Sequence, residues 1–138
     1  MIHIKNVLAL LYEGESIKLE RTDIFIMDGK IASLGQAPEN FKAEKVIDGG
    51  RMLAVPGLIN SHTHAYMSLF RNCADDRSFE DWLFKYIMPL EEKLLPEDAY
   101  WGSLLAFSEM IRTGTTCFVD MHMHINQSAK AACECGIR

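Results

Sequence analysis

Hydrophobic and polar positions alternate over short runs in residues 2–53, a pattern that predicts β-strands. The pair Asp28-Gly29 separates two of these runs, residues 24–27 and 30–35. Because a type I′ turn needs a positive φ at both central positions, this pair predicts a tight hairpin. Residues 46–55 repeat the same pattern around two glycines. We therefore expect four to six short strands that form a small sheet or sandwich.

A second apolar run follows the dipeptide Pro56-Gly57 and ends in two histidines one residue apart. Proline followed by glycine interrupts regular structure, so a new strand is expected to begin there. Side chains alternate between the faces of a strand, so His62 and His64 should point to one side and Thr63 to the other. Two imidazoles on one face can bind one metal ion.

The spacing of apolar residues then becomes helical. Ser78 followed by Asp81 resembles a capping box, and an apolar stripe follows at positions 79, 82, 83, 86 and 87. Pro89 should kink or end this helix, because proline removes a donor and clashes with the preceding turn. Pro96 suits the first turn of a second helix, which we expect at 97–112.

The remaining residues predict a strand at 115–121, a helix at 127–135 ended by Gly136, and the start of another strand at 137–138. Alternating strands and helices are typical of a parallel α/β sheet. From Gly57 onward there are 138 − 56 = 82 residues, whereas a closed (β/α)8 barrel needs about 250. We therefore expect the N-terminal portion of a longer enzyme, or a part left by cleavage.

Composition excludes several classes of protein. The chain is 49% hydrophobic and 24% charged with a net charge of −5, so an acidic balance argues against nucleic-acid binding. No apolar run approaches the roughly 18 residues of a membrane span, and the N-terminus lacks a signal-peptide pattern. The four cysteines form no C-x-x-C pair, which favours reduced thiols in a cytoplasmic protein.

Specific motifs resemble a known family. The sequence P-G-L-I-N-S-H-T-H at residues 56–64 resembles the first barrel strand of the amidohydrolase superfamily. The segments M-S-L-F-R at 67–71, F-E-D-W-L at 79–83 and P-L-E at 89–91 resemble its methylthioadenosine/S-adenosylhomocysteine deaminase and chlorohydrolase-like branch. The resemblance implies an α/β fold in two parts: part of a β-sandwich at 1–56, then the first βα units of a TIM-type barrel at 57–138, incomplete in this chain.

The resemblance also implies a metal site. In this superfamily the paired histidines after the first strand bind a divalent metal, which makes His62 and His64 the expected ligands. Zinc is the expected metal, with ferrous iron as the alternative. The further ligands and the catalytic residues come from later strands of the family fold. We therefore expect weak or absent metal binding, and no activity, in this chain alone.

Two further positions match residues that contact substrate in the nucleoside deaminases. There the residue at Trp82 lines the purine pocket and the one at Glu91 accepts hydrogen bonds from ribose hydroxyls. Core packing is an almost equal alternative for Trp82, and a solvated helix charge is the alternative for Glu91. Tyr66 and Asn72 depart from the pattern, since many deaminases have proline and glycine there. The reaction type is therefore better supported than the substrate.

A second H-x-H pair, His122 and His124, follows the next predicted strand, with Asp120 on the same face. The family does not take metal ligands from this strand, so we expect these residues to line or support the cleft. A structural metal held by all four histidines is the alternative. His3 has no partner motif and is expected to be an exposed strand residue.

The leading hypothesis is hydrolytic deamination of an adenine nucleoside of the methylthioadenosine or S-adenosylhomocysteine type. Guanine or cytosine deamination and chlorotriazine hydrolysis are alternatives within the superfamily. A non-catalytic, truncated metal-binding fragment is the alternative of a different class. The expected partner is a small molecule, a purine nucleoside or related heterocycle. Unpaired strand edges also favour a homo-oligomer.

Overall fold

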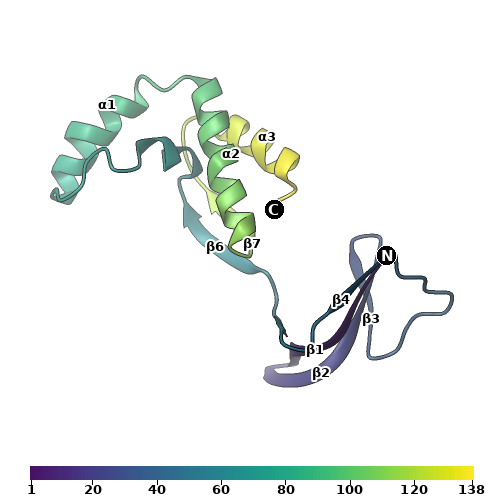
Figure 1. The fold of residues 1–138 in the computed structure, drawn as a ribbon. Helices are drawn as coiled ribbons and strands as arrows, with labels where there is room; N and C mark the ends of the chain where they lie inside the picture. The colour runs from purple at the N-terminus through teal and green to yellow at the C-terminus, as the bar shows by residue number, and fades with distance from the viewer. The chain divides into compact units, whose positions relative to one another are not determined.

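The computed structural model describes all residues, 1–138, as two compact units, Met1–Pro56 and Gly57–Arg138 (Figure 1). The first unit contains only strands. The second alternates two parallel strands with helical segments.

Five strands form one sheet in the N-terminal unit. They are β1 (Ile2–Glu13), β2 (Ser16–Met27), β3 (Lys30–Leu34), β4 (Lys45–Asp48) and β5 (Leu53–Ala54). The order is β3-β2-β1-β4, and β5 pairs with a different part of β1. Val7, Ala9 and Ile24 are buried at the centre of this unit, where β1 and β2 contribute their apolar positions.

The turns of this sheet follow the sequence pattern in one place and depart from it in another. Asp28 and Gly29 have φ values of 49° and 72°, and they join β2 to the antiparallel β3, so the predicted hairpin is confirmed. The second glycine-containing run was expected to repeat that hairpin pattern, which is wrong. Its two halves, β4 and β5, do not pair with each other, and both run parallel to β1. The 12-residue β1 is long enough to accept both.

His3 is not the exposed strand residue that its isolation in the sequence suggested. Its side chain is 14% exposed, and its Nε2 atom lies 2.8 Å from Asp23 Oδ2. The imidazole also stacks on Phe25 with ring centroids 4.3 Å apart. The partner comes from the neighbouring strand β2, 20 residues away, which no local motif could indicate.

The second unit contains two strands and five helical segments. They are β6 (Leu58–Thr63), the 3-10 helix η1 (Ala65–Phe70), the π-helix η2 (Asp81–Ile87), α1 (Met88–Glu91), α2 (Pro96–Arg112), β7 (Thr115–Asp120) and α3 (Ile125–Cys135). Strands β6 and β7 lie side by side and pair in parallel, as Figure 1 shows. The predicted strand–helix–strand–helix order is therefore confirmed.

The core of this unit lies where α2 and α3 pack together and α2 contacts β7 and η1. Phe107 of α2 is fully buried, and its ring lies 4.4 Å from that of Phe118 in β7. Gly102 allows α2 to approach η1 closely, because a Cβ there would lie 2.7 Å from the carbonyl oxygen of Tyr66. Ser68 strengthens the same contact by donating to the Gly102 carbonyl at 2.7 Å.

Pro89 does not end the helical region, so that part of the prediction is wrong. The chain stays helical from the π-helical η2 into α1, which has Pro89 in its first turn. The predicted second helix is confirmed as α2, and Gly136 ends α3. Arg138 then exchanges backbone hydrogen bonds with Thr116 and Phe118, so the chain resumes an extended pairing with β7.

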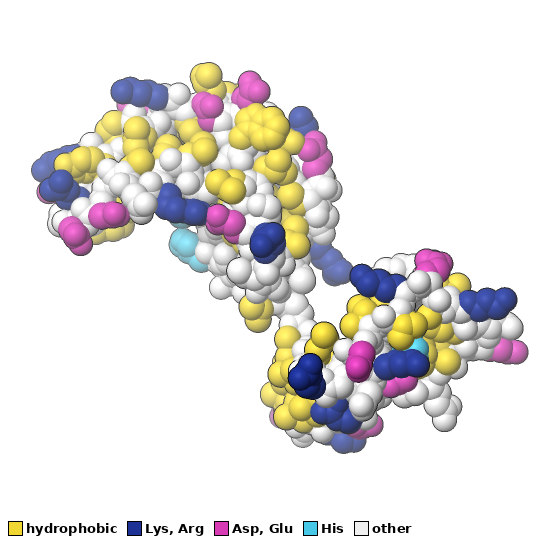
Figure 2. Space-filling view, viewed as in Figure 1, with side chains coloured by type: hydrophobic (Ala, Val, Ile, Leu, Met, Phe, Trp, Pro, Cys, Tyr) yellow, Lys and Arg dark blue, Asp and Glu magenta, His cyan; other side chains and the backbone are white.

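No helix of the structure is long and apolar enough to cross a membrane. Large apolar side chains are nevertheless exposed on both units, and Figure 2 shows them among charged groups on one face. On the two-stranded sheet of the second unit, Ile59 is 71% exposed and Val119 is 59% exposed. This small sheet therefore presents apolar side chains that nothing within residues 57–138 covers.

Candidate metal and substrate site

Strand β6 and the residue directly after it bring two imidazoles to one side, as strand alternation predicts. The ring centroids of His62 and His64 lie 5.1 Å apart with an interplanar angle of 82°. His62 is exposed and His64 is partly buried. Both rings line the same pocket, so they have access to one bound ligand.

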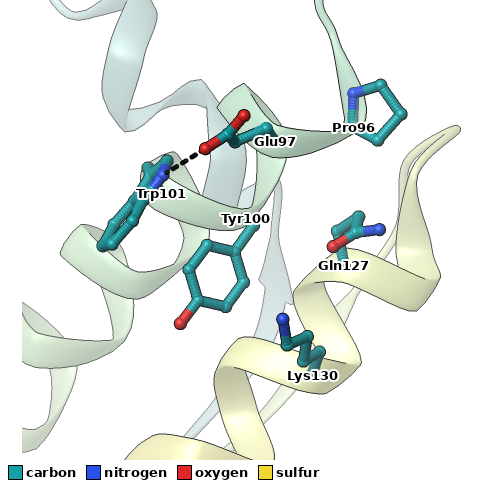
Figure 3. A pocket seen from close by; sticks show the side chains of 6 residues that line it. All are labelled: Pro96, Glu97, Tyr100, Trp101, Gln127 and Lys130. Atoms are coloured by element: carbon teal, nitrogen blue, oxygen red, sulfur yellow. Dashed lines mark hydrogen bonds between the residues drawn. The ribbon is translucent and has the colours of Figure 1, made fainter.

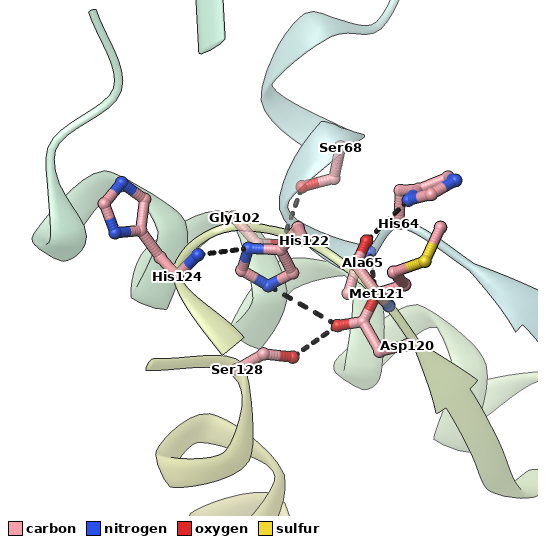
Figure 4. Close-up of polar contacts among 9 residues, drawn as sticks. All are labelled: His64, Ala65, Ser68, Gly102, Asp120, Met121, His122, His124 and Ser128. Carbon is pink, nitrogen blue, oxygen red and sulfur yellow. Dashed lines mark hydrogen bonds and ion pairs between the residues drawn. The ribbon is translucent and has the colours of Figure 1, made fainter. Parts of the chain in front are cut away.

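A hydrogen bond to the residue after β7 fixes the orientation of the His64 ring and the tautomer of its neutral form. Its Nδ1 atom lies 2.7 Å from the carbonyl oxygen of Met121, just after β7 (Figure 4). Because a carbonyl oxygen only accepts, Nδ1 carries a hydrogen, and in the neutral tautomer Nε2 has the lone pair. A backbone carbonyl on the second ring nitrogen is the usual arrangement for a histidine that binds a metal through the first.

The pocket also contains both residues that were predicted to contact substrate. It has a volume of about 710 Å³, and Trp82 and Glu91 line it together with the two histidines. The other lining residues are Tyr66, Met67, Phe79, Leu83, Ile87, Met121, His122 and Met123. Two nitrogen donors, a flat indole and a carboxylate thus face one largely apolar cavity, a composition typical of small-molecule sites.

Asp120, at the end of β7, connects three elements around this pocket. Its Oδ1 atom accepts hydrogen bonds from the backbone N–H groups of Ala65, at 3.1 Å, and Met121, at 3.0 Å. Its Oδ2 atom accepts a short hydrogen bond from the hydroxyl of Ser128 in α3. The carboxylate therefore holds the residue that follows His64 and the residue whose carbonyl binds the His64 ring. Sequence reasoning noted its face but missed this role.

His122 lines the pocket without being arranged as a ligand. Its Nδ1 atom accepts from the backbone N–H of His124 at 3.1 Å, so its hydrogen lies on Nε2. Nε2 is buried without a hydrogen-bond partner, 3.6 Å from Asp120 Oδ2. Burial lowers the pKa of His122, although the Asp120 carboxylate opposes that effect. The ring of Tyr66, 4.4 Å away, covers the imidazole.

The four-histidine structural metal site is wrong. His124 uses Nε2 to donate to the carbonyl oxygen of Leu94 at 3.2 Å, and His122 presents an N–H group rather than a lone pair. Nowhere in residues 1–138 do three or more histidine, cysteine, aspartate or glutamate side chains lie in positions that could hold a metal ion. The second H-x-H pair instead supports the wall of the pocket: His122 lines it, and His124 connects to His122 and to Leu94 through hydrogen bonds.

A second hollow lies on the outer side of α2 and α3. It has a volume of about 490 Å³ and is lined by Pro96, Glu97, Tyr100, Trp101, Gln127 and Lys130 (Figure 3). Trp101 donates to Glu97 at 3.4 Å, and Lys130 lies over the Tyr100 ring at 4.8 Å. Two pairs of its lining side chains thus contact each other, and it contains none of the residues predicted for the site.

Arg71 has a structural contact. It forms two hydrogen bonds with Glu109 of α2, at 3.1 and 2.8 Å, which attach the end of η1 to that helix. This ion pair raises the pKa of Arg71 and lowers that of Glu109. The arginine therefore orders the segment after the paired histidines from outside the pocket.

Known proteins resemble this chain in sequence and in fold. The 5-methylthioadenosine/S-adenosylhomocysteine deaminase of Thermoanaerobacter pseudethanolicus is 50% identical over 135 residues, covering 98% of this chain and 31% of that protein. The atrazine chlorohydrolase TrzN of Arthrobacter aurescens TC1, solved with zinc, superposes with a TM-score of 0.85 at 26% identity, covering 100% of this chain and 34% of that one. An adenosine deaminase from Xanthomonas campestris, solved with bound zinc, superposes with a TM-score of 0.85 at 26% identity. The match covers 99% of this chain and 32% of that one.

The chain thus spans about a third of the length of the proteins it matches. The superpositions confirm the predicted fold class, a β unit followed by the first βα units of the amidohydrolase fold. The sequence profile of the amidohydrolase family matches residues 53–138, which include β6, β7 and the whole pocket. The chain therefore belongs to the amidohydrolase family.

Proposed function

We propose that these residues form the first third of a metal-dependent hydrolase that deaminates an adenine nucleoside, of the 5′-methylthioadenosine or S-adenosylhomocysteine type. One observation carries the proposal: a single pocket is lined by His62 of β6, by His64 directly after that strand, by Trp82 of η2 and by Glu91 of α1. The substrate class rests on the name of a relative that is 50% identical over nearly the whole chain.

The residues present fit a divalent metal. The neutral His64 ring donates from Nδ1 to the Met121 carbonyl, which leaves the Nε2 lone pair available to a metal. His62 lies beside it on the same side of the strand, with the rings 5.1 Å apart. Neutral imidazoles are good zinc ligands, and both solved relatives named above contain zinc, so zinc is the proposed metal. When bound, the cation would supply Lewis acidity and an activated water at neutral pH.

The other half of the pocket is suited to the nucleoside. The indole of Trp82 offers a flat apolar face on which a purine can lie. Glu91 is partly buried at the same pocket, and a carboxylate can accept two hydroxyl donors at once. The ribose of the substrate presents such a pair of hydroxyls. Together the two side chains would hold the base and the sugar while the reacting carbon faces the histidines.

The remaining machinery is proposed to come from the two thirds of the family fold that lie outside these residues. Two ligands rarely hold a catalytic metal, so further ligands and the general acid and base must come from other strands. In this proposal residues 57–138 begin a (β/α)8 barrel, and residues 1–56 form part of a β-sandwich. The exposed side chains of Ile59 and Val119 are consistent with strands that are covered in the larger protein.

Two lesser features of the proposal follow from the same structure. A homo-oligomer is the proposed assembly, because many large apolar side chains are exposed on both units. The cytoplasm is the proposed location, because all four cysteines are free thiols.

Chlorotriazine hydrolysis is the second candidate, favoured by the superposition on TrzN. Glu91 distinguishes the two, since a chlorotriazine has no pair of hydroxyls for a carboxylate to accept. The test is ammonia release by the enzyme of family length that contains this chain, from 5′-methylthioadenosine, S-adenosylhomocysteine, guanine and cytosine, beside chloride release from atrazine. Release of ammonia from the two nucleosides alone supports the proposal. Absence of turnover with both nucleosides contradicts it.

A further inference from the structure

The helical segment that carries Trp82 and Glu91 changes its hydrogen-bond register between them. The N–H of Trp82 donates to Ser78, four residues back, at 2.8 Å, and that of Glu92 donates to Met88, also four back, at 3.0 Å. Between these two α-type bonds, the N–H of Met88 donates to Leu83, five residues back. One extra residue is therefore accommodated within the turn, as in a π-helix.

Pro89 gives a local cause for this wider turn. Proline has no N–H to donate to the carbonyl four residues earlier, and its ring clashes with that carbonyl in a regular α-helix. In this chain that carbonyl belongs to Lys85, inside the π-helical segment Asp81–Ile87. Widening the turn there moves the carbonyl away from the proline ring. The chain can thus remain helical through Pro89 and on to Glu91.

The wider turn decides which side of the helix each pocket residue faces. Trp82 and Glu91 are 91 − 82 = 9 residues apart, which in an uninterrupted α-helix is about two and a half turns. They would then face opposite sides. One wide, π-helical turn of about five residues brings Ile87 to the side of Trp82. One α-helical turn of about four residues then brings Glu91 to the side of Ile87. All three side chains line the same pocket in the structure.

We propose that the π-helical turn held open by Pro89 is the specificity-determining element of this pocket. It brings an aromatic surface and a carboxylate to one side, so that the base and the sugar hydroxyls of one nucleoside are bound together. The inference rests on the function proposed above. It assigns a role to Pro89 and to the spacing of the segment, neither of which contacts the ligand.

The test uses paired changes in the enzyme of family length. Pro89→Ala allows the segment to become a regular α-helix of unchanged length, which turns Trp82 and Glu91 to opposite sides. A second variant combines Pro89→Ala with deletion of Phe84, a residue that is 59% exposed. The deletion removes the extra residue, so that Trp82 and Glu91 return to one side of a regular α-helix. Replacing that deletion by Phe84→Ala in the Pro89→Ala protein is the matched control, because it removes the side chain without changing the spacing.

The measurement is the calorimetric Kd for 5′-methylthioadenosine in metal-depleted protein, so that no turnover occurs. Pro89→Ala and its Phe84→Ala control should raise Kd by about tenfold or more, and the deletion should return it to within about threefold of the unaltered protein. Thermal melting of all three variants separates lost binding from lost folding. Unchanged affinity in Pro89→Ala, or no recovery on deletion, overturns the inference. Failure of the unaltered protein to bind the nucleoside instead overturns the proposed function.

Discussion

The His64 ring is held by Met121: its Nδ1 atom lies 2.7 Å from the Met121 carbonyl oxygen. The residue directly after β7 therefore sets the orientation of the ring directly after β6, and the tautomer of its neutral form. The Asp120 carboxylate in turn accepts hydrogen bonds from the backbone N–H groups of Met121 and Ala65, and so holds the backbone on both sides of this contact. The parallel pairing of the two strands thus holds one imidazole in a fixed orientation at the pocket.

The carboxylate of Asp120 should contribute to metal affinity without touching the metal. Asp120→Ala releases the backbone on both sides of the His64–Met121 contact, so zinc affinity should fall by about 10- to 100-fold. A competition titration with a chromophoric chelator measures this. Ser128→Ala is the control, because Ser128 contacts only the other carboxylate oxygen, and it should change zinc affinity much less. Unaltered zinc affinity in a folded Asp120→Ala protein would show that the network does not position His64.

Glu91 should distinguish nucleosides from free bases. Glu91→Gln keeps the shape of the side chain but removes its charge and one acceptor, so KM for 5′-methylthioadenosine should rise by about tenfold or more. Activity toward a free base, which has no ribose, should be unaffected. Glu92→Gln, an exposed neighbour outside the pocket, should leave both substrates unchanged. Equal losses for nucleoside and base would exclude ribose recognition by Glu91.

The N-terminal unit should lose stability in acid through Asp23. The backbone N–H of Asn6, together with His3, lowers the Asp23 pKa below its ordinary value. The ionised carboxylate therefore stabilises the fold above the unfolded-state pKa of about 3.9, and this contribution is lost as pH falls through the lower folded-state pKa. Asp23→Asn should lower the free energy of unfolding by about 1 kcal/mol at pH 6. The effect is modest because the Asp23 side chain is one-third exposed.

Urea unfolding from pH 2 to pH 7 measures this contribution. The free energy of unfolding of the unaltered chain should decrease as pH falls below about 4, and that of Asp23→Asn should decrease less. If the free energies of unfolding of the two proteins fell in parallel with pH, the Asp23 carboxylate would not contribute to the loss of stability in acid.

Residues 1–138 on their own should self-associate through the small sheet of the second unit. Ile59 is 71% exposed on β6, and strands with exposed apolar side chains and unpaired edges favour pairing between molecules. Ile59→Lys should shift sedimentation velocity profiles toward the monomer. Leu105→Lys adds the same charge on α2, where the side chain is 45% exposed, and should have little effect. An already monomeric unaltered chain would contradict the prediction.

Most of the elements could be predicted from local sequence signals. Asp28-Gly29 has the left-handed conformation that its hairpin requires, and Pro96 and Gly136 mark the helix ends where the structure has them. Pairing between distant segments could not be predicted in the same way. The parallel pairing of β4 and β5 with β1, and the contact of His3 with Asp23, depend on the tertiary fold.

In the site, too, local features could be predicted from the sequence, and features that depend on tertiary contacts could not. His62 and His64 share a face because of strand alternation, which the sequence shows directly. The role of Asp120 depends on contacts with Ala65 and Ser128, 55 and 8 residues away, which the fold alone provides. The joint position of Trp82 and Glu91 depends on a register change whose only sequence signal is Pro89, a residue expected to disrupt the helix.

Anomalous diffraction at the zinc edge, from crystals of the enzyme of family length soaked with zinc, tests the central claim most directly. We predict a zinc peak about 2.0–2.1 Å from Nε2 of both His62 and His64, with Nδ1 of His64 still bound to Met121. A zinc ion coordinated without these two rings, or through Nδ1 of His64, would contradict the account.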